Sequence, residues 1–342
     1  MRQAPPDRRG GERPGWHSSL ARVGGPALLL ALAAAAPAAA QGDGAGFLLL
    51  PVGARAIATG GAVAAAGEGS ESVWWNPAAV ARETRREIAI HHAQTVLATS
   101  DAIIAVFPWR RVGVVAVAAN LVDLGEQEAT GEQGQVLGTL FPRNVVASLS
   151  YARTIGTRLD VGATYKLLQV RLDCSGQCAT VPVDATTTSA VDLGVRMSLA
   201  GWLPITVGAG VRNAGPGVRA PDRDERDPLP TRWQTGVLYE LPGLDRLSED
   251  VVVRLSSDVV SPTGEFAPGL RVGGEAIWQR RVAVRGGYVF DTGDDVGTEA
   301  AGPAVGLGLV AGRLTVDIAR EFQGLSVDAG QPPTYVSVRF RF

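Results

Sequence analysis

Residues 47–81 read FLLLPVGARAIATGGAVAAAGEGSESVWWNPAAVA, and the plan of the whole chain depends on this stretch. The small residues between Gly53 and Ala62 let the backbone pack closely, yet they offer too little apolar area for a free-standing core. Two tryptophans then lead into Asn76-Pro77, where the proline excludes Asn76 from the α region and predicts a turn. The stretch therefore needs a surrounding wall to pack against.

The phrases PVGARA, GGA and WWNPAAVA in this stretch resemble the N-terminal signature of the PorV/PorQ family, whose outer-membrane barrels are similar to the FadL fatty-acid transporters. FadL-type proteins also carry Asn-Pro-Ala in the hatch that plugs their barrel. The match departs from the commonest family spelling at Ala79, where Gly is frequent. The resemblance implies an N-terminal hatch over residues 41–85, with the signature residues Pro51, Gly53, Arg55, Gly60, Gly61, Trp75, Asn76, Pro77 and Ala78.

The first forty residues have the features of a secretory signal peptide. Several arginines precede an apolar run from Ala27 to Ala36, and Ala38-Ala39-Ala40 stands before Gln41. An uncleaved anchor helix is the alternative, but the apolar run is shorter than the roughly 20 residues that a membrane span needs. We therefore expect residues 1–40 to be removed on export.

Composition narrows the class of protein. The net charge of −2 indicates neither nucleic acid nor an anionic membrane surface as a partner. The chain has 43 Gly against 2 Cys and 2 Met, which favours β-structure with many turns in an oxidising compartment. No Pro/Ser-rich linker divides the chain, so we expect residues 86–342 to form one domain.

From Glu87 onward, apolar and polar residues alternate with the period of two that marks strands with unlike faces. About fourteen such runs are present, an even number as expected for a closed single-chain barrel of the bacterial outer membrane. They begin near Glu87, Asp101, Val112, Asn144, Leu159, Ala190, Ile205, Trp233, Val251, Pro268, Val282, Ala304, Leu314 and Tyr335. A soluble sandwich also alternates, so the connections and the chain end must decide between the two folds.

The predicted connections are mostly short at one end of the strands and long at the other, as in a barrel with a periplasmic and an extracellular rim. The long polar loops are expected at 123–142, 173–188, 214–230, 291–302 and 323–333. Aromatic residues fall near predicted strand ends, where the aromatic girdles of such barrels lie: Trp109, Trp202, Trp233, Tyr239, Trp278 and Phe290. These features favour the all-β transmembrane barrel over the sandwich.

The last strand, Tyr335-Val-Ser-Val-Arg-Phe-Arg-Phe342, closes on an aromatic residue. This ending resembles the C-terminal signal that the barrel-assembly machinery reads, and the residues assigned to it are Tyr335, Val338, Phe340 and Phe342. A last strand that simply has an aromatic end is the alternative.

The lumen-facing positions are predicted to collect charges of both signs: Asp160, Lys166, Asp192, Arg196, Arg254, Asp258, Arg271, Glu275, Arg285, Asp317, Arg339 and Arg341. A selectivity ring for a charged solute would favour one sign. Mixed charges instead predict contacts with one another and with a plug. We therefore expect Arg55 in the hatch signature to dock on a carboxylate of the wall.

The predicted outer loops are acidic, and one of them contains Cys174 and Cys178. A disulfide between these two residues is favoured over free thiols in an exported protein. The acidic loop around Asp291, Asp294, Asp295 and Glu299 has no EF-hand spacing, so a solvated loop is favoured over a cation site.

Motifs for enzymatic chemistry are weak. One Asp291-Thr292-Gly293 triplet lacks the second carboxylate that an aspartic protease needs, and residues 306–311 fit a dinucleotide fingerprint without the helix that should follow. His91 and His92 are neighbours on a predicted strand and point to opposite faces, so they cannot chelate one metal together. We expect no enzyme activity, no cofactor and no metal.

The resemblance implies two functions. In PorV-like proteins the barrel serves a secretion system, so secreted client proteins or secretion-system subunits would be partners. In FadL-like proteins the barrel carries long-chain fatty acids or other hydrophobic small molecules. The first function is the main hypothesis from the sequence, the second is its close alternative, and a purely structural barrel in outer-membrane lipid is a third.

Overall fold

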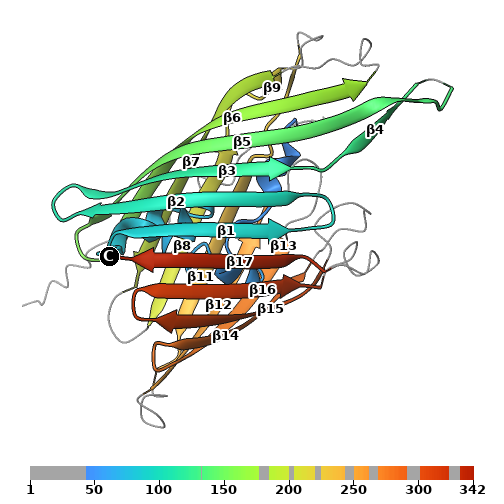
Figure 1. Ribbon diagram of the computed structural model, residues 1–342. Helices are drawn as coiled ribbons and strands as arrows, with labels where there is room; N and C mark the ends of the chain where they lie inside the picture. The colour runs from blue at the N-terminus through green and yellow to red at the C-terminus, as the bar shows by residue number, and fades with distance from the viewer. Residues whose placement is uncertain are drawn as a thin grey trace, which may run out of the picture. The chain divides into compact units, whose positions relative to one another are not determined.

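The computed structural model describes residues 44–131, 133–176, 185–199, 204–219, 225–242, 250–261, 269–290, 301–322 and 332–342. Within this part of the chain, fifteen strands form one antiparallel sheet. Fourteen of them close into a ring, because β1 pairs with β17 and β3 pairs with β5 (Figure 1). The predicted fourteen-strand barrel is confirmed. The predicted signal peptide lies outside the described residues.

The wall strands follow the predicted runs closely, since twelve of the fourteen begin at the predicted residue or within two residues of it. In chain order they are β1 (Glu87–Gln94), β2 (Thr99–Trp109), β3 (Gly113–Asp123), β5 (Val136–Ile155), β6 (Leu159–Gly176), β7 (Ala185–Ser198), β8 (Ile205–Ala214), β11 (Arg232–Glu240), β12 (Val251–Val260), β13 (Gly269–Trp278), β14 (Val282–Phe290), β15 (Gly302–Ala311), β16 (Leu314–Glu321) and β17 (Thr334–Arg341).

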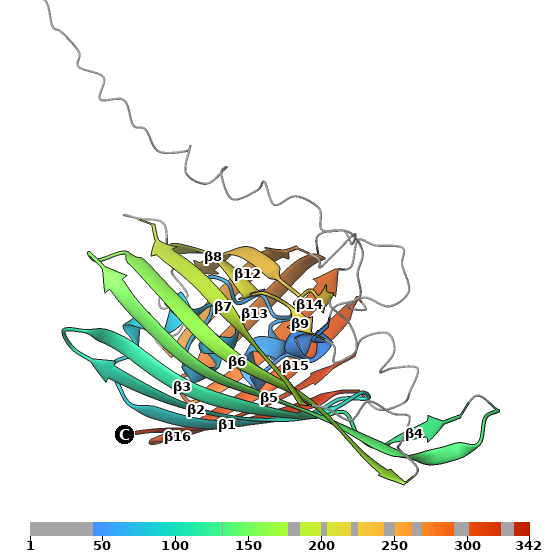
Figure 2. The same ribbon diagram turned by 90° about the horizontal axis from the view of Figure 1, so that it is seen from above.

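Strands β5 and β6 are much longer than predicted, and this corrects the expected loops 123–142 and 173–188. The two strands pair without interruption from Ile155↔Leu159 to Gly138↔Gly176, and β4 (Gln127–Thr130) adds to the edge of β5. In Figure 2 this hairpin extends past the neighbouring strands. Its outer part has no buried face to impose alternation, so the sequence there resembles a loop. Cys174 consequently lies on β6 and not in a loop.

The two ends of the ring differ. The connections 109–113, 155–159, 278–282 and 311–314 lie at one end with the C-terminus, and we call this end the turn rim. The opposite end, the loop rim, carries most of the longer connections and two short strands, β9 (Val218–Arg219) and β10 (Arg226–Asp227), which pair with each other. The exceptions are the longer connection 240–251 at the turn rim and the short connection 94–99 at the loop rim.

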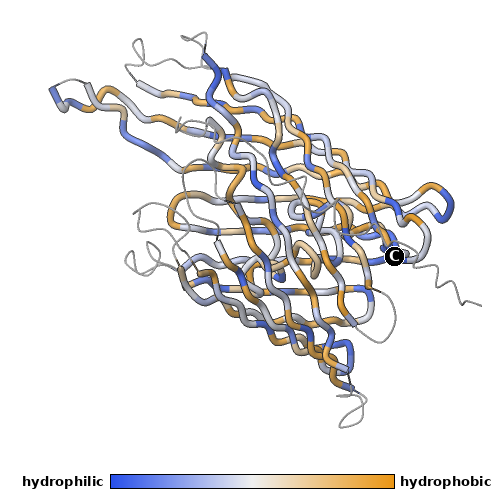
Figure 3. Tube along the Cα trace, turned by 180° about the vertical axis from the view of Figure 1, so that it is seen from behind, coloured by the Kyte–Doolittle hydropathy of each residue, from blue (hydrophilic) through white to orange (hydrophobic). Residues whose placement is uncertain are grey.

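The faces of the wall strands alternate as predicted. Along β15 and β1 the burial pattern changes at every residue, with large apolar side chains such as Leu307 and Ile90 exposed on the outer face. Figure 3 shows the resulting alternation of hydrophobic and hydrophilic positions along the strands. The predicted inward charges lie on the lumen side, where most of them are buried.

The lumen is occupied by the segment 44–86, which we call the hatch. It contains η1 (Gly46–Leu49), α1 (Ala54–Ala58), η2 (Ser70–Trp74) and η3 (Pro77–Arg82), and Figure 2 shows these helices inside the ring of strands. Helix α1 contacts β14 to β17, η2 contacts β1 and β2, and η3 contacts β5 to β7. None of the helices in the described ranges has the length and hydropathy to cross a membrane.

Candidate functional site

The interface between hatch and wall is the candidate site, and close backbone contact is its first feature. A Cβ atom added to Gly287 of β14 would overlap the backbone at Thr59 and Gly60, and one added to Gly208 of β8 would overlap Ala64. These wall glycines face the lumen. They allow the hatch backbone to lie directly on the sheet, where no side chain separates the two.

The signature glycines Gly60 and Gly61 supply the matching shape from the hatch side. Both have positive φ, 65° and 72°, a region that glycine adopts without strain. A Cβ atom on Gly60 would also lie only 3.0 Å from the backbone nitrogen of Tyr288 and 3.1 Å from the carbonyl of Val272. The GG pair of the signature is therefore the point at which the hatch turns against β13 and β14.

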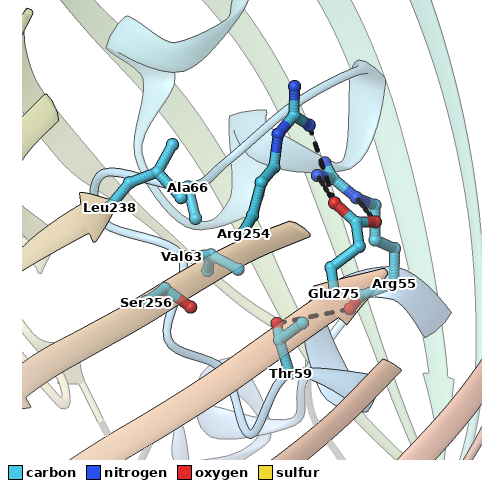
Figure 4. Close-up of a pocket in the computed structure, with 8 residues that line it drawn as sticks. All are labelled: Arg55, Thr59, Val63, Ala66, Leu238, Arg254, Ser256 and Glu275. Carbon is cyan, nitrogen blue, oxygen red and sulfur yellow. Dashed lines mark hydrogen bonds and ion pairs between the residues drawn. The ribbon is translucent and has the colours of Figure 1, made fainter. Parts of the chain in front are cut away.

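Arg55 joins the hatch to the wall through charge. Its guanidinium group donates two hydrogen bonds to the carboxylate of Glu275 on β13, at 3.1 Å and 3.0 Å, and lies 3.0 Å from Glu68 in the hatch. Arg254 of β12 approaches the same two carboxylates at 2.9 Å (Glu68) and 3.6 Å (Glu275). Figure 4 shows Arg55 and Arg254 converging on Glu275. The wall carboxylate expected for Arg55 is thus Glu275.

The charges around Glu275 continue along the wall as a ladder. Arg285 of β14 bonds to Glu275 at 2.6 Å and to Asp317 of β16 at 2.7 Å, and Arg339 of β17 bonds to Asp317 at 2.7 Å. The intervening β15 contributes Gly308, where a Cβ atom would overlap Asp317. Mixed lumen charges therefore pair with each other and with the hatch, as predicted.

Asn76 holds the second half of the hatch. Its fully buried amide donates to the carbonyls of Ala64 and Val195, at 2.7 Å and 3.2 Å, and its side-chain oxygen accepts from the N–H of Ala78 at 3.1 Å. That last bond caps η3, whose first residue is Pro77. The Asn-Pro-Ala of the signature thus forms a capped turn anchored to β7.

Backbone N–H groups of the hatch donate to wall side chains at three further points. Ala54 donates to Ser337 at 2.8 Å, Ala64 to Asp258 at 2.7 Å, and Ser70 to Glu87 at 2.9 Å. Near the turn rim, Arg82 at the end of η3 pairs with Asp160 at 2.7 Å. The hatch is therefore held by directional polar contacts around much of the ring.

A pocket that combines apolar hatch residues with polar wall residues lies on the side of the hatch that begins at Gly44. Residues of the hatch line most of it: Phe47, Leu48, Leu50, Pro51, Val52, Trp74 and Trp75. Arg212 lies 4.9 Å from the ring of Trp75, and Lys166, paired with Asp192 at 2.7 Å, lies 5.9 Å from the ring of Trp74. The Nε1 of Trp75 donates to the carbonyl of Val52 at 2.8 Å. The cavity holds about 20 Å³, room for one or two water molecules.

A second cavity of about 20 Å³ lies between the hatch and the strands β11 to β13 (Figure 4). Its lining includes Arg55, Arg254 and Glu275, together with Val63, Ala66 and Leu238. The open surface of this cavity is mostly apolar, although Arg55 of the hatch and the wall residues Arg254 and Glu275 border it.

Glu71 of η2 is a buried carboxyl group with an unusual environment. It is 3% exposed, and its Oε2 has no hydrogen-bond partner. Burial raises the pKa of Glu71 to about 7, although the nearby Arg339, Arg55 and Arg285 oppose the rise; Asp317 also faces it and favours it. In contrast, Arg55 lowers the pKa of Glu68 to about 2.

Glu71 is expected to make hatch docking depend on pH. The docked carboxyl binds its proton more tightly than a released one, whose pKa is about 4.5, so docking is strongest below pH 4.5 and weakens as the pH rises through about 7. The full change is on the order of 3 kcal/mol. Glu68 acts in a separate window, because its contribution is present above pH 4.5 and is lost as the pH falls through about 2.

The measurement is the hydrogen-exchange protection of the η2 amides at pH 5 and pH 8, corrected for the intrinsic effect of pH on exchange. Wild type is expected to be less protected at pH 8, and Glu71→Gln is expected to remove most of this difference and to stay protected. An unchanged pH dependence in Glu71→Gln would show that another group is responsible.

The other predicted residues are dispersed. Val338, Phe340 and Phe342 are exposed on the outer face of the last strand or its end, whereas Tyr335 is buried on the lumen-facing side of β17 and donates to Glu321 at 2.7 Å. Cys174 takes part in a disulfide, but Cys178 lies outside the described residues, so their pairing stays a prediction. The acidic loop 291–299 also lies outside them.

Several contact residues were not predicted from the sequence. Ser337, Glu68 and Glu71 gave no signal, because an isolated Ser or Glu is common at any surface. The wall glycines are a feature of the sequence from which the contact could be predicted. A barrel wall needs small residues at lumen-facing positions if a hatch backbone is to contact it, and such positions are occupied by Gly162, Gly194, Gly208 and Gly287.

Comparison with known proteins identifies the fold. No protein-family model and no curated protein matches the chain. Among solved structures, the CymD monoaromatic hydrocarbon channel is similar at a TM-score of 0.57 and 13% identity, covering 86% of this chain and 98% of its own. The P. putida toluene transporter TodX is similar at a TM-score of 0.58 and 10% identity, covering 85% of this chain and 99% of its own. A Pseudomonas aeruginosa FadL homologue is similar at a TM-score of 0.51 and 10% identity, covering 86% of this chain and 99% of its own. At such identities the likeness establishes a FadL-like barrel fold and not a substrate.

Proposed function

We propose that this protein is a channel of the bacterial outer membrane that carries hydrophobic small molecules past a movable hatch. The observation that carries the proposal is the cluster of apolar hatch side chains, Phe47, Leu48 and Leu50, that lines one side of the pocket at the start of the hatch, opposite the wall charges Lys166 and Arg212. The fold likeness to a hydrocarbon channel and a toluene transporter supports the same substrate class.

Passage requires the hatch to move. A dry cavity that accepts benzene holds about 150 Å³, whereas each of the two cavities beside the hatch holds about 20 Å³. The contacts of Arg55 and Asn76 hold this closed arrangement. The pocket is therefore a first binding position for an apolar molecule, and the molecule must displace part of segment 47–52 to go further.

Uptake of radiolabelled toluene and oleate by a host lacking its own FadL-type channel tests the proposal. Expression of the wild-type barrel is expected to raise uptake of at least one of them, with no gain for a neutral sugar. Leu48→Gln with Leu50→Gln should lower that uptake at least about fivefold, because each amide makes the pocket lining polar. Leu49→Gln is the matched control, since Leu49 is adjacent and does not line the pocket.

Equal uptake with and without the barrel, or equal loss in the control variant, would contradict this function. The secretion-linked function of PorV-like proteins remains a second hypothesis, supported by the hatch signature at Pro51–Ala78 and by no comparison with a solved structure. Mass spectrometry of the barrel extracted in mild detergent separates the two: secreted proteins or secretion-system subunits support the second, and bound fatty acid or hydrocarbon without them supports the first.

A further inference from the structure

Exposed arginines gather at the turn rim. Nine of them lie in its connections or at the strand ends beside them: Arg85, Arg86, Arg110, Arg111, Arg153, Arg158, Arg280, Arg281 and Arg313. Among the described connections and strand ends of this rim, Asp250 is exposed and accepts a hydrogen bond from Gln279 at 3.1 Å, and the half-exposed Glu240 is paired with Arg254 at 3.0 Å. The chain's net charge of −2 does not reveal this local concentration of positive charge.

These arginines differ from those of the lumen in having no partner. Arg55, Arg285 and Arg339 are all paired with carboxylates, whereas no ion pair joins any of the nine rim guanidinium groups to the described part of the chain. At the loop rim, Arg143 and Arg171 are likewise paired, with Asp123 and Asp173. Exposed arginines without an ion pair to the described residues also occur at the loop rim, at Arg226 and Arg320, but they are fewer there than the nine at the turn rim.

The position of the rim arginines relative to the aromatic residues defines their depth. Trp109, Tyr151 and Trp278 are exposed on the outer face and mark the aromatic girdle of the wall. Arg110 and Arg111 follow Trp109 directly, Arg153 is the next outward position after Tyr151, and Arg280 and Arg281 follow Trp278 after one residue. One to three residues correspond to about 3–10 Å along a strand, which is the distance from a girdle to the headgroup layer.

We propose that the turn rim is a binding surface for the phosphate headgroups of anionic phospholipids in the surrounding leaflet. Arginine matches phosphate oxygens with its fork of donors, and clusters of basic residues next to a membrane bind anionic lipid. The arginine-bearing connections are β5–β6, β2–β3, β15–β16 and β13–β14, which are spread along the strand order of the ring. A lipid leaflet contacts a barrel all around its circumference, so it can meet charges that are distributed along the ring. A compact acidic protein as the partner would require the charges to lie on one patch.

This surface is independent of what the lumen carries. It gives the turn rim a fixed place in a phospholipid leaflet, because the girdle residues Trp109 and Trp278 lie at its apolar boundary and the arginine pairs beyond them reach the phosphates. The two tight turns are similar in sequence: Trp109 is followed directly by two arginines and a valine, and Trp278 is followed by Gln279 and then by two arginines and a valine.

The test is titration of the detergent-solubilised barrel with phosphatidylglycerol or phosphatidylcholine, followed by native mass spectrometry. Wild type is expected to bind phosphatidylglycerol at least about fivefold more tightly than phosphatidylcholine, and the preference should shrink in high salt. The turn-rim variant combines four substitutions: Arg110→Gln, Arg111→Gln, Arg280→Gln and Arg281→Gln. It should bind phosphatidylglycerol at least about tenfold more weakly than wild type, since each arginine near an anionic surface raises the binding constant up to roughly fivefold.

The control removes four exposed arginines from the loop rim, Arg143, Arg171, Arg226 and Arg320, each replaced by Gln. It should bind phosphatidylglycerol within about twofold of wild type. Both variants are checked for folding by heat-modifiable migration on gels. Undiminished binding in the turn-rim variant, equal loss in the control, or no preference for phosphatidylglycerol in wild type would each overturn the proposal.

Discussion

Replacement of Gly287 by valine is expected to release the central part of the hatch and open a water-filled pore through the barrel. Gly287 lies on the lumen face of β14, where an added Cβ atom would overlap backbone atoms of Thr59 and Gly60. Backbone cannot move aside as a flexible side chain can. The docked arrangement is therefore expected to lose about 3 kcal/mol or more, the upper part of the range for overpacked sites.

Gly286 provides a matched control one residue away. It points to the outer face of the same strand, and an added Cβ atom would have no heavy atom within 4 Å. Single-channel recording in planar bilayers should show large, long-lived openings for Gly287→Val, and closed channels for wild type and for Gly286→Val. If the two valine variants conduct alike, the effect comes from the strand and not from hatch docking.

The second large effect is expected at the contact between Arg55 and Glu275. Removing one partner of a buried ion pair costs about 3–5 kcal/mol when the other charge is left alone. Here Glu275 keeps Arg285 at 2.6 Å, so Arg55→Ala leaves no isolated carboxylate. We therefore expect a loss of about 2–3 kcal/mol in docking, which appears as roughly 30- to 150-fold faster hydrogen exchange of α1 amides.

Three further variants test the interpretation by the same exchange measurement. Arg55→Lys keeps the charge but not the two parallel hydrogen bonds, so the exchange rate of its α1 amides should lie between the rates of wild type and of Arg55→Ala. Arg254→Ala removes a wall arginine that is 24% exposed and should change docking by about 1 kcal/mol or less. Arg55→Ala and Glu275→Gln should be non-additive when combined; additive effects would show that the two residues stabilise the hatch separately.

The strands were largely predictable because the two faces of each strand meet different environments, and the residues along the strand alternate accordingly. Alternation in β1, β6 and β15 requires only that one face meets lipid and the other meets the lumen, and this is a local property of the sequence. The prediction failed for the outer parts of β5 and β6, where both faces lack a buried surface and only backbone pairing continues the strands. Hydrogen bonding between backbones does not require any particular alternation of apolar and polar side chains, so it cannot be predicted from that alternation.

The hatch contacts were predictable in kind but not in identity. Arg55 was expected to meet a wall carboxylate, yet the choice of Glu275 over Asp258 or Asp317 depends on how α1 is placed against the ring. Arg55 and Glu275 are 220 positions apart in the chain. Their contact follows from strand register and barrel closure, and no local pattern records either of these.

The sequence alone thus predicted the number of strands, the direction of their faces and the mixed charge of the lumen, because these depend on residues next to one another. The hatch was predicted from the resemblance of residues 47–81 to a family signature. Only the tertiary structure decided which glycines touch the hatch backbone, which carboxylate pairs with Arg55, why Glu71 is buried without a partner, and how arginines from separate turns form one rim. Each of these depends on distances between segments far apart in the chain, and those distances exist only once the ring has closed.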